Sequence, residues 1–274
     1  MKVLMVARRY PPDVLSGTET VFAALYAQAQ RKHPVQLVAG YRNQREKVPE
    51  EARAVDLRQK NPWIQMAKAS LFEARQFRPD VVLSNSIEVM IPGIPTAIIV
   101  HDLNFGQIHQ GWKGRLRHVF YRLQSQFCHL IAVSEATKAR MVEIGIPADK
   151  ITVIQNGVDL TQFHPTPFPP EPPVRFVYPS RILPGKGQHI AIDALGKLRP
   201  DQRKNAHLTL VGARVDRIYA DRLQIEAFKQ PVSFAYDVEE IAPYHRQAHV
   251  ILFPTLMDEG FGFTAIEGMA SGRP

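Results

Sequence analysis

The sequence predicts an α/β protein with two doubly wound parallel sheets, the second of them incomplete. Short β-branched, mostly apolar runs alternate with longer segments that carry apolar residues at helical spacing, as in parallel sheets covered on both faces. A run with six prolines in ten residues, 164–173, interrupts this alternation. The alternation then resumes, and 274 residues are enough for two domains of ordinary size.

The first half alternates between apolar runs and helical patterns from its second residue onward. Strands are predicted at Lys2–Ala7, Val35–Ala39, Asp80–Asn85, Thr96–His101, Leu130–Ser134 and Ile151–Gln155. Helices are predicted at Thr18–Arg31, Trp63–Phe77, Lys113–Phe127 and Glu135–Ile144. This order of βα units is typical of a doubly wound sheet.

The proline-rich run is expected to be a stiff, extended linker between domains 1–163 and 174–274, because proline continues neither helix nor sheet. Later strands are predicted at Val174–Pro179, His207–Val211, Val232–Ala235 and His249–Phe253. Later helices are predicted at Gln188–Leu198, Val215–Lys229, Val238–Gln247 and Phe263–Ala270. Because a doubly wound sheet commonly has about six strands, the second domain is expected to be incomplete.

Bulk properties narrow the class of protein. The single cysteine, Cys128, cannot form an intramolecular disulfide, and it is expected to be a packed thiol. The first residues do not form a signal-peptide core, and no apolar run approaches the ~20 residues that span a bilayer. We therefore expect a cytoplasmic protein. The formal charge of +8 favours anionic partners without choosing among phosphates, nucleotides, acidic lipids and nucleic acid.

Two strand ends in the first half carry candidate ligand groups. After the first strand, Ser16-Gly17 leads into a helix, so its amides either bind an anion or form a plain strand-to-helix turn. His101 and Asp102 follow the strand that starts at Thr96. A histidine there can hydrogen-bond a sugar hydroxyl or move a proton, and the alternative is a side chain that only covers the sheet end.

A third candidate follows the first strand after the linker, in the segment 179–187. Arg181 and Lys186 precede a helix, and Gly185 and Gly187 flank the lysine. Two cations and a helix N-terminus can hold a pyrophosphate, although a surface turn with solvated cations remains the alternative. The segment is not a Walker A loop, because the required spacing is absent.

The fourth candidate is the stretch from Glu259 to Glu267. Its two carboxylates can accept hydrogen bonds from vicinal hydroxyls, and the amides of the following helix start can meet phosphates. The residues Gly260-Phe-Gly-Phe-Thr-Ala265 also fit a dinucleotide-binding fingerprint. That alternative is weaker, because the fingerprint belongs to the first βα unit of a domain and follows its strand at once.

The segment 112–127 has a basic amphipathic pattern. Its apolar positions recur at helical spacing, and its cations are Lys113, Arg115, Arg117 and Arg122. Such a helix can lie on acidic lipid, or it can turn the same apolar face toward the protein core.

Together these stretches resemble the large family of retaining GT-B glycosyltransferases called group 1 or family 4. The matching segments are 16–19, His101-Asp102, Val133-Ser134, 156–159, Ser180-Arg181, Lys186-Gly187 and 259–274. The resemblance implies two Rossmann-like domains, the first binding the acceptor and the second the nucleotide sugar. It also implies that the family continues beyond Pro274, so the chain is expected to lack the C-terminal end, and that Ser16-Gly17 replaces a paired glycine.

The resemblance implies catalytic roles for His101, Arg181, Lys186 and Glu259. By the same resemblance, Arg181 and Lys186 are expected to neutralise the diphosphate. Glu267 holds the ribose and Glu259 meets hydroxyls of the transferred sugar. The implied donor-binding residues are Gly17, Arg181, Lys186, Glu259, Gly260, Phe261, Gly262, Phe263, Thr264 and Glu267. The implied acceptor-binding residues are Ser16, Gly17 and Asp102.

The expected reaction moves a sugar from a nucleoside diphosphate sugar to a hydroxyl of a lipid-linked or soluble glycan, with retention at the anomeric carbon. No Asp-x-Asp pair occurs, so we expect no metal, and no cofactor beyond the donor substrate. No nucleic-acid partner is expected. The alternatives are a nucleotide-sugar epimerase, a phosphorylase-like enzyme, and a non-catalytic nucleotide-binding module of the same fold.

Overall fold

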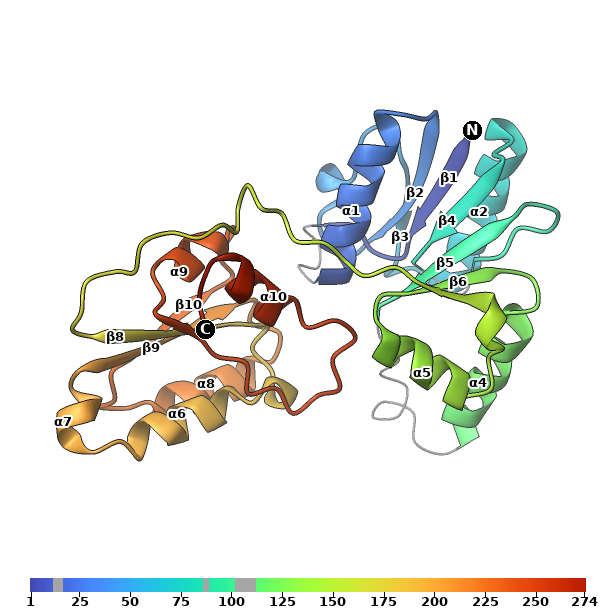
Figure 1. Cartoon of the computed structure of the whole chain (residues 1–274). Coiled ribbons are helices and arrows are strands. Elements are labelled where there is room, and N and C mark those ends of the chain that lie inside the picture. Colours follow the sequence, from blue (N-terminus) through green and yellow to red (C-terminus); the bar gives the residue numbers. More distant parts are fainter. Residues whose placement is uncertain (12–16, 86–88, 102–111) are drawn as a thin grey trace. The chain divides into compact units, whose positions relative to one another are not determined.

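The computed structural model describes residues 1–11, 17–85, 89–101 and 112–274, and for 112–117 it describes the backbone alone. The chain divides into two compact units, Met1–Asn156 and Gly157–Pro274 (Figure 1). The sequence places this division later, at the proline-rich segment 164–173. Each unit is built on its own parallel sheet, so the predicted α/β class with two doubly wound sheets is confirmed.

The first unit has a sheet of order β3-β2-β1-β4-β5-β6-β7 in the described part of the chain, and its neighbouring strands pair in parallel. The strands are β1 Val3–Ala7, β2 Val35–Tyr41, β3 Arg53–Asp56, β4 Val81–Ser84, β5 Thr96–Val100, β6 His129–Ala132 and β7 Ile151–Val153. The edge strand β3 is absent from the sequence prediction, because Arg-Ala-Val-Asp has neither an apolar run nor β-branched repetition.

The helices of the first unit cover both faces of its sheet. They are α1 Gly17–Gln30, α2 Pro62–Phe77, α4 Trp112–Gln124 and α5 Glu135–Glu143, with short 3-10 turns at Arg45–Lys47 and Ala148–Lys150. Figure 1 shows α1 and α2 on opposite sides of the sheet, which is the doubly wound arrangement. Both α4 and α5 pack near β5 and β6, where Tyr121 and Met141 share a core with Ile98 and Leu130.

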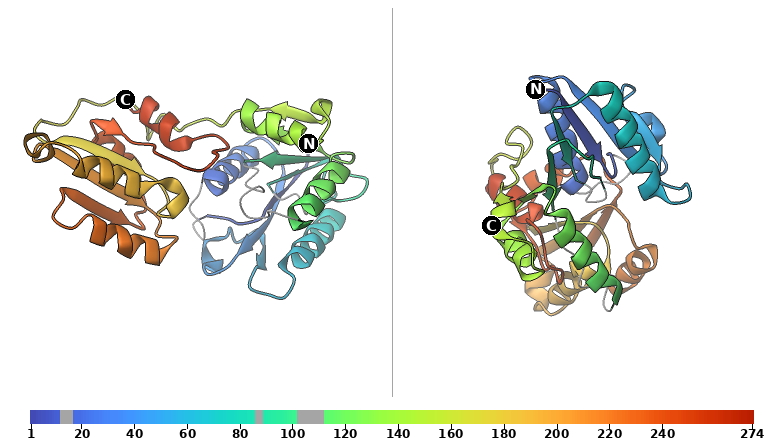
Figure 2. Two further views of the ribbon diagram at one scale, coloured as in Figure 1. Left: turned by 90° about the horizontal axis from the view of Figure 1, so that it is seen from below. Right: turned by 90° about the vertical axis from the view of Figure 1, so that its right-hand side faces the viewer.

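The second unit has a parallel sheet of order β10-β9-β8-β11 in the described residues. Its strands are β8 Val174–Pro179, β9 Ala206–Gly212, β10 Val232–Tyr236 and β11 Val250–Ile251. Its helices are α6 Gln188–Gly196, α7 Pro200–Arg203, α8 Arg217–Glu226, α9 Ala242–Arg246 and α10 Phe263–Ala270, with a 3-10 turn at Pro184–Lys186. Figure 2 shows α6 and α8 side by side, and they cover the face that carries Tyr178 and Leu210. The opposite face packs Val177 and Val211 against Tyr244 of α9.

The proline-rich segment 164–173 docks on the second unit. Arg273 is only 3% exposed, and its guanidinium donates to the carbonyl of Thr166 at 2.8 Å and to that of Pro167 at 3.2 Å. His249 bonds the Pro169 carbonyl through Nε2 at 2.9 Å. These bonds fix the segment to the unit that follows it in the sequence.

No helix in the described part of the chain combines the length and the apolar character that crossing a bilayer requires.

Candidate functional site

The carboxyl end of β8 is the centre of the candidate site in the second unit. The strand ends at Pro179, and Ser180 and Arg181 follow directly. The Thr264 hydroxyl donates a 2.8 Å hydrogen bond to the Pro179 carbonyl, so the first turn of α10 is held against the strand end. Two segments 85 positions apart in the sequence are thereby joined.

Arg181 supplies an uncompensated positive charge at this strand end. The residue is half-buried, and its guanidinium has no partner among the described residues. Its backbone is held in place, because the buried Gln188 side chain donates to the Arg181 carbonyl at 2.8 Å. A fixed, partly desolvated cation without a partner attracts an anionic ligand.

Lys186 is 8% exposed and forms an ion pair through Nζ with Oε1 of Glu259. The Thr255 hydroxyl donates to the same carboxylate oxygen at 2.9 Å. A buried ammonium group without a partner would be costly, so Glu259 compensates it while no anion is bound. The Tyr178 hydroxyl donates to the Lys186 carbonyl, which fixes the turn that carries the lysine.

Gly187 lies between the lysine turn and the loop that carries Glu259. It has a φ of 75°, and a Cβ atom there would overlap the carbonyl oxygen of Pro254. On the other side of the turn, the Leu256 N–H donates to the Gly185 carbonyl at 2.9 Å. Glycine is required at position 187, because both its conformation and this close backbone approach exclude a side chain.

The N-terminus of α10 presents free backbone donors. Gly262 has a φ of 83°, and the Ala265 N–H makes a bond of 3.1 Å to the Gly262 carbonyl. The N–H groups of Phe263 and Thr264 make no hydrogen bond to another described residue. Gly260, Phe261 and Gly262 connect Glu259 to this helix. Residues 252–259 separate β11 from Gly260, whereas a dinucleotide fingerprint follows its strand at once. Free amides and the helix dipole suit an anion.

Glu267 lies on α10, one turn after these amides. Burial raises the pKa of its carboxyl to about 7. The carboxylate lies 3.9 Å from Nε2 of His245, a distance too long for a hydrogen bond. His245 is completely buried, and burial, with a smaller contribution from the positive charge of Arg273, lowers its pKa to about 4. The imidazole is therefore neutral at pH 7, and the two side chains do not form an ion pair.

Sequence reasoning missed His245. The residue comes from α9, whose five residues contain no motif, and it meets Glu267 only through the packing of α9 beside α10. Nε2 of His245 has no hydrogen-bond partner among the described residues.

The predicted residues of the first unit follow two strands of its sheet. Gly17 is the first residue of α1, after β1, and His101 follows β5. Nε2 of His101 is buried without a hydrogen-bond partner among the described residues, and burial lowers the pKa of His101 to about 4. The imidazole is therefore neutral at pH 7 and can donate or accept one hydrogen bond. The predicted residues Ser16 and Asp102 lie outside the described residues.

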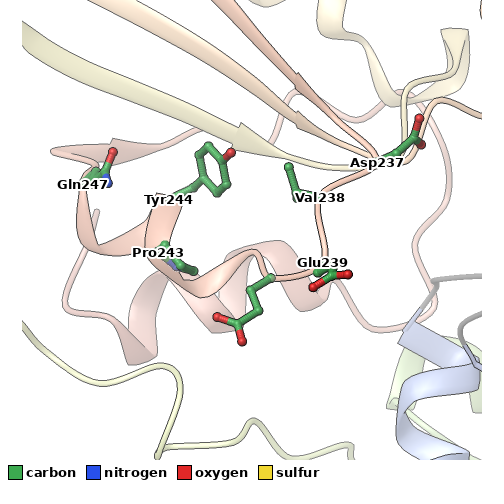
Figure 3. Close-up of a pocket in the computed structure, with 7 residues that line it drawn as sticks. Asp237, Val238, Glu239, Pro243, Tyr244 and Gln247 are labelled. Carbon is green, nitrogen blue, oxygen red and sulfur yellow. The ribbon is translucent and has the colours of Figure 1, made fainter.

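A recess of about 670 Å³ also opens near the end of β10, between that strand and α9 (Figure 3). Its lining residues are Asp237, Val238, Glu239, Glu240, Pro243, Tyr244 and Gln247. Three of these side chains are carboxylates, which repel a diphosphate, and none of them was predicted as a site residue. The groups whose charge suits an anion are instead those around Arg181 and Lys186.

Comparison with known families matches both units of the chain. The family described as Glycosyltransferase Family 4 matches residues 15–162. The family described as Glycosyl transferases group 1 matches residues 173–274.

Among characterised sequences, the chain is similar to the glycogen synthase of Mycobacterium tuberculosis, with 29% identity over 222 residues that cover 73% of this chain and 52% of that enzyme. It is also similar to the lipopolysaccharide core biosynthesis mannosyltransferase LpcC of Rhizobium leguminosarum bv. viciae, with 30% identity over 135 residues, 44% of this chain and 38% of that protein. The matched segments thus span about half or less of these relatives.

Among solved structures, Anabaena Alr3699/HepE in complex with UDP and glucose superposes with a TM-score of 0.79 at 20% identity, covering all of this chain and 79% of that one. WaaG, a glycosyltransferase involved in lipopolysaccharide biosynthesis, superposes with a TM-score of 0.76 at 16% identity, covering 99% of this chain and 80% of that one. At these identities the likeness shows the fold, which is the GT-B arrangement of two Rossmann-like units. Since the family 4 match alone covers more than half of the residues, the chain belongs to the group 1 and family 4 glycosyltransferases.

Proposed function

We propose that this protein transfers a sugar from a nucleoside diphosphate sugar to an acceptor hydroxyl with retention at the anomeric carbon, using no metal ion and no cofactor besides the donor. The observation that carries the proposal is the set of anion-binding groups at the end of β8. Arg181 and the amides of Phe263 and Thr264, which have no partner in the described part of the chain, and the buried Lys186 belong to segments that hydrogen bonds tie together.

The diphosphate is the charge that this set would neutralise. Arg181 is free to bind it, whereas Lys186 must exchange its partner Glu259 for a phosphate oxygen. Negative charge grows on the diphosphate as the bond to the sugar breaks. Cations and amides already fixed there therefore act mainly in the transition state. Two side-chain cations and a helix N-terminus can take the place that a divalent metal holds in other phosphate sites.

The exchange gives Glu259 its own function. Once the ammonium group turns to the phosphate, the carboxylate is free to accept hydrogen bonds from the hydroxyls of the transferred sugar. Glu267 would accept from the ribose, for which its carboxyl must be ionised. In the first unit, neutral His101 would contact the sugar near the reacting carbon, and Gly17, Ser16 and Asp102 would serve the phosphate and the acceptor.

Retention is proposed without an enzymic nucleophile. The departing phosphate itself would take the proton of the attacking hydroxyl on the same face of the sugar. This step needs the phosphate to stay in place, which the fixed cations favour.

Relatives support a glycan acceptor and a uridine nucleotide donor. LpcC is named for lipopolysaccharide core biosynthesis, and the glycogen synthase for a soluble glucan. The Anabaena protein holds UDP and glucose. We therefore propose a UDP-sugar donor and a lipid-linked or soluble glycan as acceptor.

Thermal-shift measurements with UDP, GDP, ADP and their sugars test the donor site first. The matching nucleotide should raise the melting temperature, and the rise should grow with the logarithm of its concentration above the Kd. The Arg222→Ala variant, which loses an exposed cation of the same unit, should respond like wild type. If no nucleoside diphosphate shifts the melting temperature, the proposal fails. If one binds but the intact protein neither transfers nor hydrolyses its sugar, the chain is a non-catalytic module.

A further inference from the structure

Helix α4 exposes an apolar stripe to solvent. Val119, Phe120, Leu123 and Phe127 are 49%, 44%, 60% and 69% exposed. Phe120, Leu123 and Phe127 follow Val119 by one, four and eight residues. This spacing places the four side chains on one face of α4 and of the turn after it. Large side chains exposed together in this way mark an interaction surface.

The opposite side of the same segment faces the protein core. Tyr121, Gln124, Ser125 and Cys128 are all at most 7% exposed. Tyr121 and Cys128 belong to the core that also contains Met141 of α5. The alternative that the apolar stripe of 112–127 packs on the core is therefore wrong for the residues from 119 onward, because another stripe occupies that position.

The surroundings of the apolar stripe are basic. No Asp or Glu occurs between positions 103 and 134, whereas Lys113, Arg115, Arg117 and Arg122 all lie within the amphipathic segment. Arg122 is exposed and its side chain lies against Gly145, beside the stripe.

The net charge of the whole chain also resides in this unit. The first unit has 21 Lys and Arg against 13 Asp and Glu, and the second has 13 of each. The first unit therefore carries the formal charge of +8, and the second carries none. A positive surface is drawn to anionic lipid headgroups over about a Debye length.

We propose that the stripe of Val119, Phe120, Leu123 and Phe127 inserts into the headgroup boundary of an anionic membrane, so that α4 lies in the plane of the interface. An apolar face combined with flanking cations is the pattern that binds such surfaces, since buried apolar area and attraction to acidic lipid add together. This surface does not involve the donor site, and the proposal stands without the proposed reaction.

A second exposed apolar stripe shows what distinguishes the first. On and after α8, Ile218, Ile225 and Phe228 are 85%, 76% and 74% exposed. That helix balances its two arginines with two carboxylates, Asp221 and Glu226, within a unit of zero net charge. Helix α8 therefore has no excess of positive charge to attract anionic lipid. It serves as an internal control for the effect of exposed apolar area alone.

Co-sedimentation of the full chain with vesicles tests the proposal. Vesicles of equal parts phosphatidylcholine and phosphatidylglycerol should bind it, those of phosphatidylcholine alone should bind far less, and added salt should weaken binding. Leu123→Gln combined with Phe127→Gln should weaken binding on the order of ten-fold. Arg115→Gln combined with Arg122→Gln should weaken it about five-fold for each cation removed.

The matched control is Ile225→Gln combined with Phe228→Gln, which removes similar exposed area from α8 and should leave vesicle binding unchanged. The substituted residues are exposed wherever the structure describes their side chains. Each variant should therefore keep the circular dichroism spectrum of the wild type. Equal binding to both vesicle types, or wild-type binding by the Leu123/Phe127 variant, overturns the proposal. So does a dimer in light scattering that the same variant converts to monomers, because a second copy would then cover the stripe.

Discussion

The candidate residues at the strand ends of the two sheets differ in charge. In the second unit, Arg181 and Lys186 stand at the end of β8, and hydrogen bonds from Gln188, Thr264 and Tyr178 fix the surrounding backbone. In the first unit, the candidate residue at the end of β5 is His101, which burial keeps neutral. Yet the unit whose candidate residues are charged has no net charge, and the unit whose candidate residue is neutral carries all of it.

This difference separates two uses of positive charge. In the second unit two cations, Arg181 and Lys186, stand at the end of one strand, as the proposed catalysis of phosphate departure requires. In the first unit the excess is spread over exposed side chains, which favours attraction to an extended anionic surface rather than to one ligand. Net charge alone, taken over the whole chain, does not choose between these two uses.

The largest effect is expected from Arg181→Ala. Removing this cation should reduce sugar transfer by about 10²–10³-fold, since it removes a donor to the charge that develops in the transition state. Steady-state kinetics measure the loss, and Arg222→Ala provides the matched control. Activity near wild type in Arg181→Ala would mean that the end of β8 is not the phosphate site.

Gly187→Ala is expected to cost about 2–4 kcal/mol of unfolding free energy, because the new Cβ atom meets the Pro254 carbonyl at a positive φ. Urea unfolding of the second unit measures it. Gly157→Ala is the control: a Cβ atom there meets nothing within 4 Å, so its change should stay within ~0.5 kcal/mol. Equal stability of both variants would show that the lysine turn and the Pro254 loop are not in contact.

Glu267 gives the second unit a pH dependence of its own. Its folded pKa, about 7, lies above the ordinary value of 4.5. The stability that the protonated carboxyl contributes is therefore fully present below pH 4.5 and is lost as the pH rises through 7. Above pH 7, Glu267→Gln should therefore be more stable than wild type by up to about 3 kcal/mol. Unfolding curves at several pH values measure the difference, with the exposed Glu240→Gln as control. A difference that does not change between pH 4.5 and 7 would contradict the burial of this carboxyl.

His101 should show the opposite pH dependence of stability. Its folded pKa of about 4 lies below the ordinary 6.5, so its contribution to stability is present above pH 6.5 and is lost as the pH falls through 4. Nuclear magnetic resonance should find its imidazole neutral throughout the neutral range, with His101→Asn identifying the signal. Titration near pH 6.5 would remove the contrast between the two strand ends.

The sequence predicted well where most strands lie along the chain, because parallel strands that are buried on both faces have long apolar runs. It did not predict β3, an edge strand in which only two apolar residues stand between Arg53 and Asp56. For α4, periodicity identified the apolar stripe but not its direction. Either of two stripes can face the core, and only packing against Met141 decides between them.

The candidate site shows the same limit. Motif spacing found Arg181, Lys186, Glu259 and Glu267 separately. It could not reveal the ion pair between Lys186 and Glu259, whose positions differ by 73, or the approach of His245 to Glu267. The ion pair depends on how the loops after β8 and β11 meet, and the approach of His245 to Glu267 depends on how α9 packs beside α10. No local pattern encodes either contact.

The docked proline-rich segment determines where the chain can be divided. A piece beginning at Val174, the start of β8, would remove Thr166 and Pro167 and leave the buried guanidinium of Arg273 without several acceptors, which is strongly destabilising. A piece beginning at Gly157 keeps them. Studies of the second unit in isolation should therefore begin before the prolines rather than after them.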